Sequence, residues 1–109
     1  IQAWSSNELY IVISLSEANA LPESFSLDRA YPNPFNPTTT LSFTIPVDSE
    51  VSLSIYNLQG REVATLIDAN MDAGYHSVVW NADEFSSGLY FVKMIAGDHI
   101  SSQKLLLVK

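Results

Sequence analysis

The feature that most constrains the fold of this chain is the alternation of apolar and polar residues over short segments. In residues 39–45 the apolar side chains of Leu41, Phe43 and Ile45 alternate with threonine and serine, and residues 51–56 repeat the pattern. Alternation with a period of two places the apolar side chains on one face of a β-strand, whereas a helix needs a period of about 3.6 residues. The pattern therefore predicts an all-β chain.

Four further segments are rich in β-branched or aromatic residues, as strands are. They are residues 62–67, 75–81, 89–95 and 101–108. Gly60, Gly74, Gly88 and Gly97 fall between the expected strands, where turns need residues that tolerate positive φ. The length of 109 residues suits one domain. We therefore expect an antiparallel β-sandwich of about seven strands.

The start of the chain differs from the remainder. Residues 8–15 are strongly strand-like, but the looser residues 16–26 follow them. Two interpretations are open: residues 8–15 end an upstream domain or linker, or they pair with the sandwich along an edge. We expect the first, with a boundary that separates residues 1–20 from a domain at residues 21–109, in which residues 21–27 act as a connector.

Composition excludes several classes of protein. The formal net charge is -7 and the five basic residues are scattered, so the electrostatic footprint of a nucleic-acid-binding protein is missing. Without cysteine, neither a disulfide nor a thiolate metal site can form. No apolar run approaches the roughly 20 residues of a transmembrane helix. The oligomeric state is left open.

Residues with catalytic or metal-binding chemistry are few. His76 and His99 are the only histidines, and no Gly-x-Ser-x-Gly motif accompanies them. We expect His76 to be a hydrogen-bonded residue at the edge of the core and His99 a solvated turn residue. Residues 68–74 imitate an EF-hand loop, but their glycine is in the wrong position, which favours a turn between strands. Neither an enzyme nor a cofactor is expected.

Large aromatic residues offer one further possibility, a platform on which sugars stack. Trp80 lies in an alternating strand, which favours core packing, and Trp4 lies in the unassigned start of the chain. A runner-up function is therefore a non-catalytic accessory sandwich that binds carbohydrate or protein beside a catalytic domain. Such a module needs an exposed aromatic row or an open concave face.

Residues 30–37 contain three prolines, which remove amide donors and exclude a central strand. We expect an extended segment with Tyr31 and Phe35 anchored on the sandwich; a ligand-binding loop is the alternative.

Together with this proline-rich segment, three later elements resemble the C-terminal sorting domain of the type IX secretion system. These elements are residues 51–60, residues 73–82 and residues 86–90, and the resemblance covers residues 21–109. The residues that carry the motif are Tyr31, Pro32, Asn33, Pro34, Phe35, Asn36, Pro37, Gly60, Gly74, Trp80, Ser87, Gly88 and Tyr90.

The resemblance implies an immunoglobulin-like sandwich that acts as a signal. It directs a larger parent protein through the periplasm and across the outer membrane to the cell surface or the medium, and it is removed after export. The implied partners are the outer-membrane secretion machinery and a surface peptidase of sortase-like activity.

The end of the chain resembles the terminal element of that family, an apolar strand between basic residues. The residues expected to be recognised by the machinery are Lys104, Leu105, Leu106, Leu107, Val108 and Lys109. A buried final strand flanked by protective lysines is the alternative, and the two can hold together if the strand offers a free edge to its receptor.

Overall fold

The structure is a computed structural model that describes residues 21–109. This part of the chain is all-β and contains seven strands. They are β1 (Ser26–Leu27), β2 (Thr38–Ile45), β3 (Ser49–Tyr56), β4 (Glu62–Met71), β5 (Gly74–Asn81), β6 (Gly88–Ala96) and β7 (His99–Leu107). The strand expected at residues 8–15 and the domain boundary expected at residue 20 lie outside the described residues.

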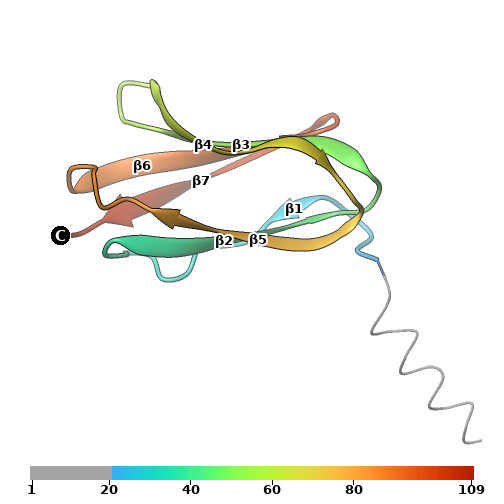
Figure 1. The fold of residues 1–109 in the computed structure, drawn as a ribbon, viewed down its shortest axis with the longest axis horizontal. Helices are drawn as coiled ribbons and strands as arrows, with labels where there is room; N and C mark the ends of the chain where they lie inside the picture. The colour runs from blue at the N-terminus through green and yellow to red at the C-terminus, as the bar shows by residue number, and fades with distance from the viewer. Residues whose placement is uncertain (1–20) are drawn as a thin grey trace, which may run out of the picture.

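The strands form two antiparallel sheets that lie one above the other (Figure 1). One sheet has three strands in the order β1-β2-β5, and the other has four in the order β4-β3-β6-β7. Consecutive strands β3 and β4 pair as a hairpin, as do β6 and β7. The connection from β1 to β2 stays within the three-stranded sheet, and the remaining three connections, β2 to β3, β4 to β5 and β5 to β6, cross between the sheets. The predicted β-sandwich with about seven strands is confirmed.

The core lies between the two sheets and follows the predicted alternation. Leu41, Phe43 and Ile45 of β2 are fully buried, and β3 and β6 supply fully buried side chains from the facing sheet. The facing residues are Val51, Leu53, Ile55, Val92 and Met94. Burying an aliphatic or aromatic side chain contributes about 1.5–3 kcal/mol relative to leaving it in water, so these two rows supply much of the driving force for folding.

Two local predictions were wrong. Strand β4 continues to Met71, so the turn expected at residues 68–74 shrinks to the two residues between β4 and β5. Asp68 and Asn70 pair with Ser52 and Glu50 of β3, and their exposed side chains remain in water. An edge strand with one solvated face accepts such polar residues.

The other correction concerns the expected connector, residues 21–27. Ser26 and Leu27 form β1 and pair with Thr44 and Phe43 of β2. A strand of two residues is too short for alternation to reveal it. In residues 21–109, no helix has the length and apolar character that crossing a membrane requires.

Candidate recognition surface

The proline-rich segment joins the two sheets along one edge of the sandwich. Tyr31 and Thr40 of β2 exchange two backbone hydrogen bonds, with N···O distances of 3.1 and 2.9 Å. Four residues later, Phe35 pairs in parallel with Leu107 of β7. The Tyr31–Pro32, Asn33–Pro34 and Asn36–Pro37 peptide bonds are cis. The segment therefore runs from the three-stranded sheet to the end of the four-stranded sheet.

The two aromatic residues of this segment differ from each other. Phe35 is 2% exposed and packs against Trp80, with ring centroids 5.5 Å apart, as predicted for an anchored residue. Tyr31, by contrast, is 79% exposed, so its predicted anchoring was wrong. Ala30, which is 5% exposed, takes the buried position at this point, and only the backbone of Tyr31 is tied to the sandwich.

Four hydrogen bonds attach Asn33 and Phe35 to the outer edge of β7. The Asn33 side chain donates from Nδ2 to the carbonyl oxygen of Lys104 at 2.9 Å and accepts at Oδ1 from the Leu106 amide at 3.0 Å. The Phe35 amide donates to the Leu106 carbonyl, and the Val108 amide donates to the Phe35 carbonyl, both at 2.9 Å. The free strand edge expected near the end of the chain is therefore covered.

Further contacts continue this closure along β7. Gln103 accepts at Oε1 from the Ala30 amide at 2.8 Å and donates from Nε2 to the Asp28 carbonyl at 2.6 Å. His99 stacks on Phe25, with ring centroids 5.4 Å apart, and its Nε2 lies 2.5 Å from the hydroxyl of Ser101. His99 is thus half-buried at the start of β7, and its expected place in a solvated turn was wrong.

The terminal segment, Lys104 to Lys109, divides into two sets of side chains. Leu105 and Leu107 point into the core and are 0% and 1% exposed. Leu106 and Val108 are 37% and 47% exposed, and both lysines are exposed as well. This division follows from strand geometry, in which successive side chains point to opposite faces. Only the outward set is accessible to another molecule.

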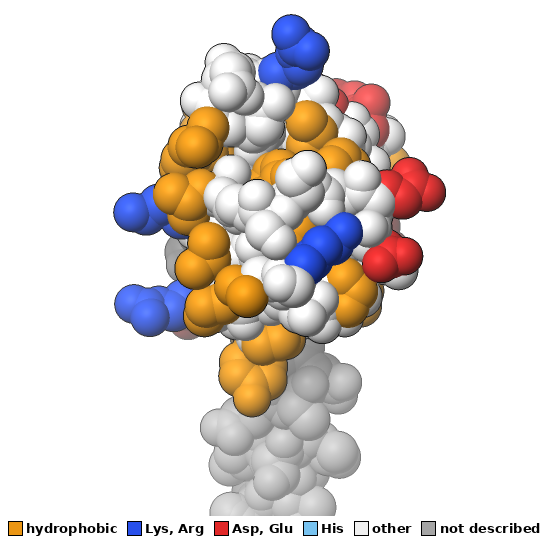
Figure 2. Space-filling model, turned by 90° about the vertical axis from the view of Figure 1, so that its left-hand side faces the viewer, with side chains coloured by type: hydrophobic (Ala, Val, Ile, Leu, Met, Phe, Trp, Pro, Cys, Tyr) orange, Lys and Arg blue, Asp and Glu red, His pale blue; other side chains and the backbone are white. Residues whose placement is uncertain are grey.

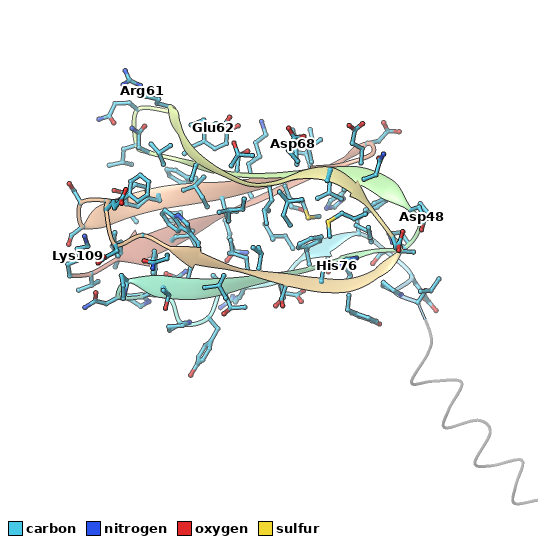
Figure 3. The ribbon with its side chains drawn as sticks, in the orientation of Figure 1. Asp48, Arg61, Glu62, Asp68, His76 and Lys109 are labelled. Atoms are coloured by element: carbon cyan, nitrogen blue, oxygen red, sulfur yellow. The ribbon has the colours of Figure 1, made fainter. Side chains whose placement is uncertain are left out.

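Lys109 is held against the turn between β5 and β6, where Figure 3 labels it. Its amide donates to the hydroxyl of Ser87 at 3.1 Å, and its Nζ donates to the carbonyl oxygen of Asp83 at 2.5 Å. The last residue therefore has a defined position next to Ser87, one of the motif residues.

Most other motif residues gather at the same end of the molecule. Trp80 and Tyr90 are buried, and their rings lie 5.6 Å apart in an edge-to-face arrangement. The Tyr90 hydroxyl donates to the carbonyl of Ser86 at 2.6 Å. Gly88 begins β6 there. Gly74 pairs with Ile45 at the opposite end of β2 and lies apart from this group.

Gly60 closes the turn between β3 and β4. Its φ of 82° lies in the left-handed region that favours glycine, and its amide donates to the carbonyl of Asn57 at 2.9 Å. The Asn57 side chain accepts from the amides of Gln59 and Arg61, both at 3.0 Å. These bonds explain why asparagine and glycine stand at the two ends of this turn.

In the described part of the chain, groups with catalytic or metal-binding chemistry do not converge. The half-buried His76 stacks on Phe43, and its Nε2 lies 2.7 Å from the carbonyl of Asp72, which confirms its hydrogen-bonded place at the core edge. Within residues 21–109, no group of three histidine, cysteine, aspartate or glutamate residues could hold a metal ion. Asp48, Glu62 and Asp68 are well separated in Figure 3. Trp80 is 3% exposed and packs in the core, as predicted.

Comparison with known proteins places this arrangement in a family. No curated protein matches the chain. Residues 29–109, which are more than half of the chain, match the model of a family described as a secretion system C-terminal sorting domain. The match includes both the proline-rich segment and the strand that it covers. The chain therefore belongs to this family, and it is a type IX sorting signal that leads through the periplasm to the cell surface or the medium.

Proposed function

We propose that the secretion machinery reads this signal through the outward side chains of the terminal segment: Lys104, Leu106, Val108 and Lys109. The alternating exposure of this segment carries the proposal, because Leu105 and Leu107 are buried while their neighbours face water. In this interpretation Leu105 and Leu107 hold the strand in the fold. Their neighbours contact the partner.

Coverage of the β7 edge supports recognition through side chains. The outward backbone groups of Lys104, Leu106 and Val108 already bond to Asn33 and Phe35, so a partner cannot add a strand there without displacing the proline-rich segment. Leu106 and Val108 instead offer apolar surface with a lysine on either side. Burial of such surface contributes about 25 cal/mol per Å², and the lysines add charge complementarity.

The test is export of a reporter protein fused to the full 109-residue chain in a bacterium with type IX secretion. Replacing Leu106 and Val108 together by glutamate removes the apolar contact, and we expect the reporter to stay in the periplasm. Circular dichroism of the purified fusion tail checks that it still folds.

Ile100→Glu is the matched control for this substitution. Ile100 lies on the same strand and the same outward face and is 63% exposed, but it is outside the terminal segment. We expect this variant to be exported like the parent fusion. Surface delivery of the Leu106 and Val108 double variant at the parent level would overturn the proposed recognition residues.

We further propose that a surface peptidase of sortase-like activity removes the domain after export, upstream of β1. Residues 21–25 support this proposal because they precede the first strand and belong to neither sheet. A protease acts on backbone outside the sheets more readily than on a paired strand. Mass spectrometry of the released tail locates the cut, and a tail that begins within β1 or later would contradict the proposal.

We also propose that the sandwich is immunoglobulin-like. Support comes from the seven antiparallel strands in sheets of three and four, with connections that cross between the sheets. The fourth strand, β4, joins the sheet of β3, β6 and β7. The accessory binding module gains no support from the family match.

A further inference from the structure

A surface groove of about 800 Å³ lies between the proline-rich segment and β7. One wall carries Arg29, Tyr31, Pro32 and Pro34, and Lys104 lies on the opposite wall. This volume is within the range of about 300–1,000 Å³ that is typical of ligand sites. The proposed recognition residues include Lys104 but none of the four residues of the first wall.

The groove is cationic although the protein is acidic. Arg29 and Lys104 are two of only five basic residues in a chain of net charge -7, and none of the acidic residues within 21–109 lines the groove. Figure 2 views the end of the molecule at which the chain terminates. Hydrophobic side chains gather along one side of that end with basic side chains beside them, and acidic side chains lie on the other side. On this end of the molecule, the side that has basic and hydrophobic side chains but no acidic ones therefore attracts an anionic partner.

The chemistry of the walls narrows the class of ligand. Asn33 and Gln103 already use their side-chain polar atoms in bonds to the backbone, so Arg29 and Lys104 remain to bind charge. Tyr31, at 79% exposure, and the adjacent proline rings add flat apolar surface. The two cations can bind carboxylates, and the aromatic and proline rings beside them can contact apolar groups. A ligand in which carboxylates alternate with apolar groups therefore fits this groove.

We propose that this groove binds an extended acidic segment of the protein that reads the sorting signal. The inference rests on the proposed function and adds the chemistry of the partner. Arg29 and Lys104 pair with carboxylates of the segment, and Tyr31 and the prolines contact its apolar side chains. The groove adjoins the outward face of the terminal segment, because Lys104 belongs to both. One partner can therefore contact both surfaces at once.

The test is titration of the isotope-labelled full chain with a blocked peptide of alternating glutamate and leucine, followed by NMR. We expect saturable shifts at Arg29, Tyr31 and Lys104. Replacing Arg29 and Lys104 together by glutamate should weaken binding by about tenfold, since each replacement exchanges an attraction for a repulsion. A second peptide, with glutamine in place of every glutamate, should bind to the parent chain no more tightly than the glutamate peptide binds to the double variant.

The charge-matched control replaces Arg61 and Lys93, which lie outside the groove, by glutamate. Both double variants have the same net charge, so equal weakening would show a diffuse electrostatic effect and overturn the groove. Absence of saturable binding would overturn it too, as would shifts confined to other strands. A failure of the sorting role would be detected separately. A reporter that carries the unaltered chain would then stay in the periplasm, whether or not the peptide binds in the NMR titration.

Discussion

Leu105 and Leu106 are adjacent and chemically identical, but the fold gives them different environments. Leu105 is fully buried, whereas Leu106 is 37% exposed on the outer face of β7. The difference arises from the pleat alone, because successive side chains of a strand point to opposite faces. A single terminal segment can therefore stabilise the domain with one set of leucines and present the other set to a partner.

We predict that Leu105→Ala lowers the free energy of unfolding by about 2–5 kcal/mol, because it leaves a cavity in the core. Leu106→Ala should change the same quantity by less than about 1 kcal/mol, as is usual for surface substitutions. Chemical denaturation of the two variants measures both values. Equal losses would contradict the assignment of the two side chains to different faces.

At the scale of single elements, the sequence was most informative where a strand is long and has one buried face. The alternation in residues 39–45 and 51–56 located β2 and β3 to within two residues. It failed for β1, which has two residues, and for the end of β4, where Asp68 and Asn70 face water in an edge strand. Local pattern cannot reveal pairing that depends on a distant partner.

The proline-rich segment illustrates the same limit for the site. Its three prolines correctly predicted an extended segment outside the central strands, and Phe35 is anchored as expected. Its docking on β7 depends on bonds from Asn33 and Phe35 to residues more than 70 positions away, which no local pattern encodes. The covered edge and the exposed Tyr31 were missed for that reason.

We predict that Asn33→Ala loosens the proline-rich segment from β7. The substitution removes the acceptor for the Leu106 amide and the donor to the Lys104 carbonyl, so hydrogen exchange at the Leu106 amide should accelerate. The free energy of unfolding should fall by roughly 1 kcal/mol, since both bonds are solvent-exposed. Asn36→Ala is the matched control, because Asn36 is exposed in the same segment. Equal exchange rates of the Leu106 amide in the two variants would contradict the predicted role of Asn33.

At the scale of the whole molecule, the buried core of the described residues extends from Ala30 to Leu107. The family match has nearly the same limits as this core, since it covers residues 29–109. The sequence already indicated this family through the order of its motif elements. The sequence could not show which side chains of the terminal segment are buried and which face outward, nor the groove beside them. Both depend on the assembled sheets.

We predict that a chain reduced to residues 21–109 folds with the same thermal midpoint as the full chain, to within about 2 °C. The reason is that the family match begins at residue 29, within the shorter chain. A domain of this size shifts by about 4–8 °C for each kcal/mol lost. Circular dichroism during heating measures the midpoint. A fall of 5 °C or more would show that residues 1–20 contribute to the domain.

Closure of the sandwich by residues far apart in the sequence has a consequence for quality control in the cell. The bonds of Asp28, Ala30 and Asn33 to β7 span 71 to 75 positions, so one wall of the groove is synthesised well before the other. A protein whose synthesis stops before β7 lacks both the outward terminal side chains and the closed groove. Export through this signal would thereby be reserved for chains translated through β7 and the terminal segment and then folded.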